Sequence, residues 1–378
     1  MKIVIACNAF KGSLTSVRAG RIIARAFRRA MPDVEIHEVP IADGGDGTLD
    51  CIAAAVASKR VRKKVSGPLF APLTADYLLI DNGRAAVVEM ARASGLALLR
   101  REERDTARAT TLGTGLLIRD AIERGCEKII VGIGGSATTD GGTGAAAALG
   151  YVFRDARGRA LEPRGASLAR IRKIDDSSVL DKFKDVEIIV ACDVANPLLG
   201  PGGAAVMYAP QKGASPAQVK QLEAGLKNLA DVAARDLGLN FRNTPGAGAA
   251  GGMGFGLMTF LSARLVSGID MMIEAAGLEE KLHGADLLIT GEGRMDAQSA
   301  QGKAPFGLLK VAKKHYVPVI AFVGAVQGEA ALCRAGFRAV IPIVSGPMPL
   351  DHSMANAADL LHAAAFRTAR LLIVNGKS

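Results

Sequence analysis

Alternating strand and helix patterns at the two ends of the chain constrain its fold more than any other feature of the sequence. Lys2–Cys7 is a nearly continuous apolar run typical of a buried strand, and Val17–Ala30 carries apolar side chains at helical spacing. A second strand and helix follow over Val34–Val39 and about Thr48–Ala57. Two successive β-α units predict parallel strands, whose carboxyl ends share the sheet edge where open α/β sheets bind ligands.

The same alternation returns near residue 285. Strands are expected at Asp286–Thr290, Val319–Val323 and Ala339–Ile343, with helices at Pro305–His315 and Gly328–Ala335 between them. We therefore expect a parallel-sheet α/β domain of flavodoxin-like or Rossmann-like type. It would be discontinuous, with residues 1–65 and 285–378 contributing to one sheet.

The middle of the chain has a different pattern. The apolar segments Ala75–Ile80 and Ala85–Met90 flank Asp81-Asn82-Gly83-Arg84, and Asn-Gly between two such segments is a strong hairpin signal. Antiparallel strands indicate an inserted second domain of mixed α/β type, which we place at residues 66–284. Its other expected elements are a helix at Leu112–Arg124, strands at Lys128–Ile133 and Glu187–Cys192, and a long helix at about Pro216–Leu237. A cleft between the two domains is the expected active site.

Composition narrows the classes of function. The 378 residues are 49% hydrophobic and 22% charged, which is typical of a globular protein, and the length fits about two domains. Aromatic residues make up 4% with no Trp, so few rings are present to stack on the bases of single-stranded nucleic acid. The net charge of +10 attracts anions of every kind, including phosphorylated metabolites. We interpret the basic run Lys59–Lys64 as a solvated turn or strand edge without a partner.

Cysteine usage and hydropathy predict a cytoplasmic protein that does not contact membranes. The five cysteines are scattered and include no C-x-x-C, so neither a disulfide framework nor a zinc site is indicated, and the five histidines have no metal-ligand spacing. The first apolar run ends at Lys11, too early for a signal peptide. Two uncharged stretches, Val194–Gln211 and Gly246–Ala263, are too rich in glycine for a lipid-spanning helix.

Six glycine-rich loops contain charged or hydroxyl side chains, and most of them follow an expected strand. They are Asn8–Ser13, Ala42–Thr48, Gly132–Gly142, Cys192–Pro197, Pro210–Ala214, and Thr290–Gln298 with Gly302-Lys303. Glycine allows main-chain N–H groups to close on phosphate oxygens, lysine and arginine neutralise phosphate charge, and carboxylates hold a hard cation such as Mg²⁺. These are the groups that phosphoryl transfer requires.

The familiar nucleotide-binding motifs are mostly absent. The sequence contains no G-x-x-x-x-G-K-[ST], H-R-D or D-F-G. Gly132-x-Gly134-x-x-Ala137 matches a relaxed dinucleotide fingerprint, with Asp155 near the spacing of a ribose ligand, so an NAD(P)-dependent oxidoreductase of a small hydroxy acid is one alternative. Because Asp140 and two glycines interrupt the helix that this fingerprint should open, we interpret the loop as a phosphate cradle instead. A non-catalytic nucleic-acid-binding protein, the other alternative, would depend on net charge alone.

Seven motifs, occurring in order, resemble the type I bacterial glycerate kinase family. They are Phe10-Lys-Gly-Ser13, Ala42-Asp-Gly-Gly-Asp-Gly-Thr48, Gly134-Gly-Ser-Ala-Thr-Thr-Asp-Gly-Gly142, Cys192-Asp-Val with Asn196-Pro-Leu, Pro210-Gln-Lys-Gly-Ala214, Gly248-Ala-Ala-Gly-Gly252, and Thr290-Gly-Glu-Gly-Arg294 with Asp296 and Gln298. The resemblance implies two α/β domains and the use of ATP and Mg²⁺ to phosphorylate D-glycerate, generally giving 2-phosphoglycerate. Two positions depart from the family pattern, since Asn8-Ala9 stands in place of Asp-Ser and Asp46 stands where Glu is common.

With this chemistry in view, individual residues are assigned expected roles. Asp193 follows an apolar strand and is expected to orient or deprotonate the substrate hydroxyl. Two further catalytic residues are expected: Lys11 would face phosphates or the substrate carboxylate, and Arg294 would bind that carboxylate with two hydrogen bonds. Glu292 and Asp296 are expected to hold Mg²⁺. The residues expected to bind ATP are Gly134, Gly135, Ser136, Thr138, Lys212 and Lys303, and those expected to bind D-glycerate are Ser13, Asp43, Asp46 and Asn196. No nucleic acid or membrane partner is expected, and a homodimer is the assembly considered.

Overall fold

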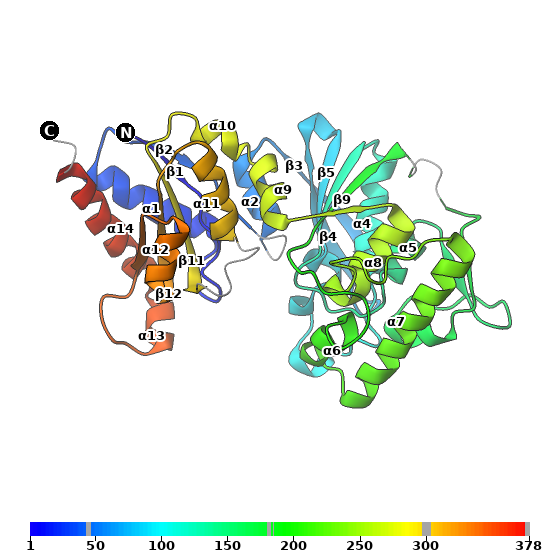
Figure 1. Cartoon of the computed structure of the whole chain (residues 1–378). Helices are drawn as coiled ribbons and strands as arrows, with labels where there is room; N and C mark the ends of the chain where they lie inside the picture. Colours follow the sequence, from blue (N-terminus) through cyan, green and yellow to red (C-terminus); the bar gives the residue numbers. More distant parts are fainter. Residues whose placement is uncertain (43–46, 180–182, 184, 297–303, 375–378) are drawn as a thin grey trace. The chain divides into compact units, whose positions relative to one another are not determined.

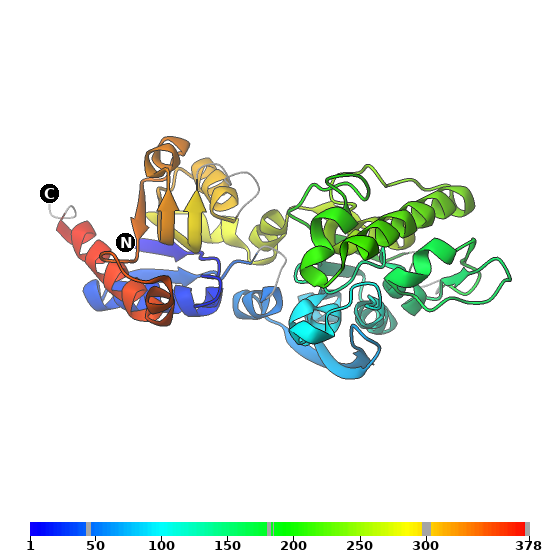
Figure 2. The same cartoon turned by 90° about the horizontal axis from the view of Figure 1, so that it is seen from below.

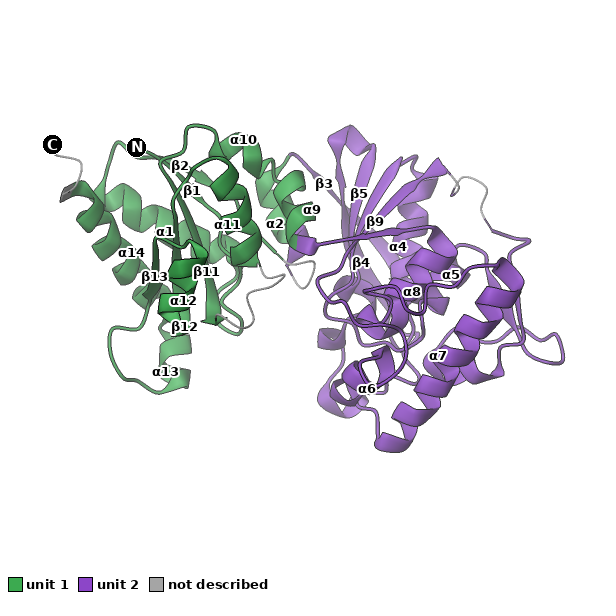
Figure 3. Cartoon of the chain, in the orientation of Figure 1, with its two compact units in different colours: residues 1–43, 50–56, 269–378 green, residues 44–49, 57–268 purple. Residues whose placement is uncertain are grey.

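The chain divides into two compact units (Figures 1 and 3). The computed structural model describes residues 1–42, 47–179, 183, 185–296 and 304–374. Unit 1 comprises residues 1–43, 50–56 and 269–378, and unit 2 comprises residues 44–49 and 57–268. We propose that these units are the two domains expected from the sequence. Their limits differ from the expected residue 65, because the strand at Lys59–Ser66 pairs within the sheet of unit 2, and from the expected residue 285, because unit 1 resumes at Ile269.

Unit 1 is built on a five-stranded parallel sheet with the strand order β13-β12-β11-β1-β2. Its strands are β1 (Lys2–Ile5), β2 (Glu35–Glu38), β11 (Leu287–Asp296), β12 (Val319–Gln327) and β13 (Ala339–Pro342). β1 pairs directly with β11, in a register that aligns Ile3 with Leu287. The two ends of the chain therefore meet in one sheet, and the expected parallel α/β fold class is confirmed.

Helices cover both faces of this sheet (Figure 2). α1 (Ser16–Ala30) and α14 (Ala357–Val374) pack together on one face, and α11 (Ala304–Lys314) and α12 (Glu329–Ala335) lie on the other. The other α-helices in residues 1–56 and 268–374 are α2 (Thr48–Ala55), α9 (Gly268–Ala275), α10 (Leu278–Leu282) and α13 (Leu350–Ala355). The core contains fully buried side chains from both ends of the chain, among them Ile3, Phe27, Phe322 and Leu361.

Unit 2 contains a six-stranded mixed sheet with the order β10-β9-β6-β5-β4-β3. These strands are β3 (Lys59–Ser66), β4 (Pro72–Ile80), β5 (Ala85–Glu89), β6 (Lys128–Gly132), β9 (Glu187–Ala191) and β10 (Arg264–Val266), and a separate antiparallel pair is formed by β7 (Val152–Arg154) and β8 (Lys173–Asp175). β4 and β5 form the expected hairpin, with Asn82 of the turn at φ 53°. The basic run lies in β3, which is an edge strand as interpreted, and Lys63 pairs with Asp120 at 2.6 Å.

The helices of unit 2 are α3 (Ala91–Ser94), α4 (Leu112–Glu123), α5 (Thr143–Ala148), α6 (Ala204–Tyr208), α7 (Pro216–Leu237) and α8 (Ala249–Leu261). α7 has the expected limits, because its end signals are strong. Ser215 and Gln218 form a reciprocal capping box, Pro216 occupies the first turn, and Gly238 ends the helix at φ 70°.

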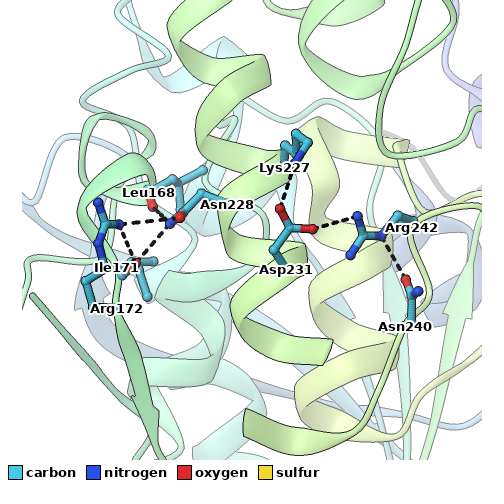
Figure 4. Close-up of polar contacts among 8 residues, drawn as sticks. All are labelled: Leu168, Ile171, Arg172, Lys227, Asn228, Asp231, Asn240 and Arg242. Carbon is cyan, nitrogen blue, oxygen red and sulfur yellow. Dashed lines mark hydrogen bonds and ion pairs between the residues drawn. The ribbon is translucent and has the colours of Figure 1, made fainter. Parts of the chain in front are cut away.

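Polar contacts along α7 fix it to the surrounding segments (Figure 4). The Asn228 amide donates to the main-chain oxygens of Leu168 at 2.8 Å and Ile171 at 3.0 Å. Asp231 accepts from Lys227 and from Arg242, at 2.8 Å and 2.7 Å. Among the helices of the described residues, none combines the length and apolar character needed to cross a membrane.

Candidate functional site

The strand that contains Glu292, Arg294 and Asp296 is longer than the sequence suggested. We expected a strand to end at Thr290 and a loop to follow, and this expectation is wrong. β11 continues to Asp296 because β12 also continues and pairs with it, aligning Glu292 with Val323 and Asp296 with Gln327. Side chains alternate along a strand, so the three candidate residues at even positions project from the same face.

Glycines in β11 and β12 allow the first loop of the chain to lie directly on this strand. A Cβ at Gly291 would lie 3.3 Å from Phe10 Cζ, and one at Gly293 would lie 3.3 Å from the main-chain nitrogen of Lys11. A Cβ at Gly324 would lie only 2.5 Å from the Gly293 oxygen. The Gly-x-Gly pattern in this segment therefore serves close packing inside a sheet, and we had mistaken it for a loop signal.

The first loop is a compact turn that presents Lys11 to solvent. Phe10 and Leu14 exchange main-chain hydrogen bonds at 2.9 and 3.0 Å, and Gly12 adopts φ +80° between them. The Ser13 hydroxyl donates to the Phe10 oxygen at 3.0 Å, and Asn8 Oδ1 accepts from the Ala9 main-chain N–H at 2.7 Å. Asn8 thus stabilises its own loop, and the Lys11 side chain is exposed.

A cavity of about 450 Å³ lies within unit 1, beside the carboxyl ends of its strands. Its lining includes Lys11 and Ser13 from the first loop and Glu292 and Arg294 from β11. The structure therefore brings four expected site residues together, two of them cationic. Asp296 is not among the lining residues.

The two expected Mg²⁺ ligands are separated along β11. At about 3.3 Å per residue, the four-residue step from Glu292 to Asp296 places their Cα atoms about 13 Å apart. Mg²⁺ binds its ligands at about 2.0–2.1 Å, so one ion cannot contact both carboxylates directly along a straight strand. Within the described residues, no group of three or more His, Cys, Asp and Glu side chains is arranged to hold a metal. Of the two carboxylates, Glu292 is better placed to bind an ion in the cavity, because it is 8% exposed and lines that cavity.

The glycine-rich loop Gly132–Gly142 is organised around a buried lysine. The Lys212 ammonium donates to Ser136 Oγ and to the main-chain oxygen of Thr138, both at 2.7 Å. All three residues are buried, and Lys212 is only 2% exposed. Burial lowers the pKa of Lys212 to about 7, although the nearby Asp140 carboxylate opposes this shift. The Ser136 and Lys212 side chains are thus bonded to each other, whereas the buried Thr138 hydroxyl has no hydrogen-bond partner among the described residues. Only Gly134 and Gly135 keep exposed surface in the segment from Gly134 to Gly142.

Asp140 organises the other end of this loop, and the sequence analysis assigned it no role. Its carboxylate accepts from the Thr111 N–H and hydroxyl, both at 2.8 Å, and from the N–H groups of Gly142 and Gly144 at 3.2 and 3.3 Å. Burial raises the pKa of Asp140, and these hydrogen bonds oppose the rise. The sequence feature that could have indicated this role is the position of the Asp shortly before α5, which is typical of a residue that caps a helix.

The Gly248–Gly252 motif packs against the same loop. A Cβ at Gly251 would lie 2.0 Å from the Thr138 oxygen, and the Gly251 oxygen accepts from the Gly141 N–H at 3.1 Å. Gly251 and Gly252 have φ values of +71° and +86°, which favour glycine. This motif therefore shapes the Gly132–Gly142 loop rather than forming a separate site.

Asp193 and Asn196 both contact neighbouring backbone. Asp193 Oδ1 accepts from the Gly268 N–H at 2.7 Å, at the first residue of α9, and Ser267 Oγ lies 3.4 Å away. The Asn196 side chain accepts from the Tyr208 hydroxyl at 2.6 Å and donates to the Gly202 oxygen at 2.7 Å. Asn196 thus holds its own loop, and Asp193, which is exposed, caps a helix with one of its oxygens.

Three expected site residues, Asp43, Asp46 and Lys303, lie outside the described residues. Among the described residues that follow this stretch in the sequence, Gly47 and Leu49 donate their N–H groups to Glu89 at 3.3 Å and 3.1 Å. Glu89 is 2% exposed and lies 3.5 Å from the Arg92 guanidinium. We missed this residue, and the available signal was a carboxylate at the end of an otherwise apolar strand.

The dinucleotide fingerprint does not have the structure that its chemistry requires. The helix after Gly132-x-Gly134 begins only at Thr143. Asp155, the expected ribose ligand, instead pairs with Arg159 at 2.8 Å. The oxidoreductase alternative therefore has no support in the structure.

Comparison with known proteins identifies close relatives along the whole chain. Residues 3–373 match the model of the family described as the glycerate kinase family. Among curated proteins, a glycerate kinase of Bacillus subtilis is 42% identical over 371 residues, covering 98% of this chain and 96% of that protein. A glycerate 2-kinase of Escherichia coli is 42% identical over 375 residues, covering 99% and 98%.

A solved structure has the same fold. The crystal structure of a Salmonella typhimurium LT2 protein assigned as glycerate kinase 2 matches with a TM-score of 0.89 and 40% sequence identity, covering 100% of both chains. The similarity thus includes both units and the segments that contain the cavity and the Gly132–Gly142 loop.

Proposed function

The chain belongs to the glycerate kinase family and is therefore a phosphotransferase, and we propose that it transfers the γ-phosphoryl group of ATP to a hydroxyl of D-glycerate, giving 2-phosphoglycerate. The observation that carries this proposal is the near-complete coverage by relatives named glycerate kinase, one of them named glycerate 2-kinase. The cations and the carboxylate that line the cavity of unit 1 agree with phosphoryl transfer.

Lys11 and Arg294 are the proposed charge-neutralising residues. Both side chains are exposed and line the cavity, and Arg294 also donates to Gln327 Oε1 at 3.3 Å. A guanidinium can bind a carboxylate or a phosphate with two parallel hydrogen bonds, whereas an ammonium acts as a compact charge. These residues would stabilise the negative charge that is spread over the transferred phosphoryl group.

Mg²⁺ is a proposed cofactor. Glu292 has the oxygen ligand that this ion prefers, and we propose it as the direct contact, with Asp296 contributing at most through water. The ion would neutralise charge on the phosphate oxygens of ATP. Ser13, whose hydroxyl oxygen can still accept a hydrogen bond, stays a proposed contact to the substrate.

The residues of unit 2 are proposed to act in two ways. Gly134 and Gly135 keep exposed main chain and stay proposed contacts to a bound anion. Ser136, Thr138 and Lys212 are proposed to hold that loop in shape. Asp193 stays the proposed residue that orients or deprotonates the hydroxyl, and its bond to the Gly268 N–H would fix its orientation.

Asn196, Asp43, Asp46 and Lys303 stay proposed substrate or nucleotide contacts, and a cleft between the domains stays a prediction. The cytoplasmic location and the homodimer are likewise proposals, and sedimentation of the purified protein would test the assembly.

The decisive experiment measures ADP release with D-glycerate and a panel of small hydroxy acids, and reads the position of the phosphate by phosphorus NMR. We expect ATP- and D-glycerate-dependent turnover and a product phosphorylated at the 2-position. A product phosphorylated at the 3-position would correct the regiochemistry, and absence of ADP release with D-glycerate would overturn the proposal.

A further inference from the structure

The cavity of unit 1 has a charged side and an apolar side. The residues of the two sides follow or belong to different strands in the sheet order β13-β12-β11-β1. Lys11 follows β1 and Arg294 lies in β11, whereas Ile343 follows β13, and Leu350 and Met354 belong to α13. The two cations thus come from the β11 and β1 part of this strand order, and the apolar side chains of Ile343, Leu350 and Met354 come from the segments that follow β13.

The cavity is larger than D-glycerate needs. D-glycerate has seven non-hydrogen atoms and would occupy roughly 210 Å³ even at the ~30 Å³ that each water molecule takes in the liquid. The cavity measures about 450 Å³, about twice that volume. On the same scale the ten non-hydrogen atoms of adenine would take roughly 300 Å³, so the cavity has room for the purine ring of a nucleotide, and its volume is in the range of about 300–1,000 Å³ that is usual for small-molecule sites.

The chemistry of the walls also matches a nucleotide better than a hydroxy acid. D-glycerate has almost no apolar surface to place against Ile343, Leu350 and Met354, whereas a purine ring has two apolar faces. At the charged side, Lys11 and Arg294 are suited to phosphate oxygens. The first residue of the eleven-residue helix α11, Ala304, is also in the wall, and the amino end of a helix favours anions.

Small residues of β12 lie between the two sides. Gly324 and Ala325 both line the cavity, and their short side chains leave room for a flat ligand that extends across the sheet edge. Met354 of the apolar side packs against the first loop, since a Cβ at Gly12 would lie 2.6 Å from Met354 Cε. The apolar wall and the Lys11 loop are therefore parts of one continuous surface.

We propose that this cavity binds the nucleotide substrate, with the purine against Ile343, Leu350 and Met354 and the phosphates at Lys11 and Arg294. This inference rests on the proposed function, and it moves the nucleotide from the loop for which the sequence predicted it. In that loop the Ser136, Thr138 and Lys212 side chains are buried, and the Lys212 ammonium is bonded to the Ser136 hydroxyl and the Thr138 main-chain oxygen. The first loop and the α13 segment would then select for a nucleoside phosphate over smaller phosphate donors.

Substitution of Ala325 by a large side chain tests the inference. Ala325 is exposed and lines the cavity, so Ala325→Phe should fill the space without disturbing the core. Ala330→Phe, an exposed position of α12 outside the lining, is the matched control. By calorimetry, we expect Ala325→Phe to weaken binding of Mg-ADP at least about tenfold and to leave binding of D-glycerate unchanged, while the control binds both like the native protein. Weakened D-glycerate binding with unchanged Mg-ADP binding would overturn the inference.

Photoaffinity labelling of the full-length protein provides a second readout. 8-Azido-ADP should label peptides that contain Ile343–Ala357, and excess ADP but not D-glycerate should prevent the labelling. Labelling confined to peptides that contain Gly132–Gly142 or Lys212 would overturn the inference even if D-glycerate is phosphorylated normally. Labelling of Ile343–Ala357 in a protein that does not turn over D-glycerate would instead support the nucleotide site and reject the proposed function.

Discussion

Lys212 shows how strongly the surroundings of one residue determine its role. By residue type, a lysine after Pro-Gln in a polar loop is a plausible phosphate ligand, and the sequence predicted that role. In the folded protein its ammonium is buried and donates to Ser136 and Thr138. Nothing local to the Pro210–Ala214 motif reveals this, because the partners lie more than seventy positions earlier in the chain.

The buried ammonium should make stability depend on pH. Burial lowers the pKa of Lys212 from 10.5 to about 7, so between pH 7 and 10.5 the unfolded chain binds a proton that the folded protein does not. The free energy of unfolding should therefore rise with pH in this window and should be insensitive to this group below pH 7. We would measure urea unfolding of the native protein and of Lys212→Met at pH 7, 8 and 9. From pH 7 to pH 9 the free energy of unfolding of the native protein should rise by about 1–3 kcal/mol more than that of Lys212→Met. A difference that stays constant with pH would contradict the prediction.

Asp193→Asn separates a catalytic role from a helix-capping role. A group that removes a proton acts chiefly in the transition state, so loss of its charge should lower kcat by about 10²- to 10⁴-fold while ATP binding stays nearly unchanged. Asn caps a helix nearly as well as Asp, so a residue that only accepts from the Gly268 N–H should tolerate the change at a cost of at most about 1 kcal/mol. Measuring kcat, ATP affinity and melting temperature on one preparation distinguishes the two roles. Near-normal kcat would end the catalytic assignment.

The spacing along β11 predicts unequal metal effects at Glu292 and Asp296. Because one Mg²⁺ cannot contact both carboxylates directly, Glu292→Gln should raise the Mg²⁺ concentration for half-maximal turnover by at least about tenfold. Asp296→Asn should raise it by less than about threefold. Turnover should vanish with excess chelator and return with Mg²⁺ or Mn²⁺. Equal effects of the two substitutions would show that β11 does not separate the two carboxylates as described.

At the scale of elements, the sequence predicts best where local signals at an element's ends agree. α7 has its expected limits because Ser215, Gln218 and Gly238 mark both ends. β11 was expected to be shorter, because the part after Thr290 contains two glycines and three charged residues, and only pairing with β12 makes that part a strand. Pairing between distant segments leaves no local signal. For the same reason the local patterns suggested candidate site residues but could not show which of them line one cavity.

Asn228→Ala tests how α7 is held. The Asn228 amide is the donor to the Leu168 and Ile171 oxygens, and its removal should lower the free energy of unfolding by about 1–3 kcal/mol (Figure 4). Lys227→Ala, on the neighbouring exposed position, should change it by no more than about 0.5 kcal/mol, because exposed ion pairs contribute little. Urea unfolding of both variants provides the comparison. Equal losses would mean that the Asn228 hydrogen bonds contribute little to stability.

At the scale of the whole molecule, the two hydrophobic cores differ in which parts of the chain contribute side chains to them. The core of unit 1 combines Ile3 and Phe27 with Leu287 and Leu361, so it needs both ends of the chain. The core of unit 2 draws all its residues from positions 61–265. The sequence predicted this organisation because β-α alternation occurs at both ends and an antiparallel hairpin lies between them. The sequence could not show that residues 57–65 belong to unit 2, since this depends on which sheet β3 joins.

This difference predicts how fragments should behave. Residues 57–268 contain the complete six-stranded sheet and its core, so this fragment alone should unfold cooperatively in urea. It lacks Gly47 and Leu49, which bond to Glu89, so its stability should be somewhat lower than that of unit 2 in the full chain. Residues 1–56 contain β1 and β2 without β11, which pairs with β1, and should be unfolded alone because two short strands cannot bury an apolar face. Circular dichroism and urea titration of the two fragments test both expectations. A folded 1–56 fragment would contradict the dependence of β1 on β11, and a non-cooperative 57–268 fragment would mean that unit 2 needs unit 1 to fold.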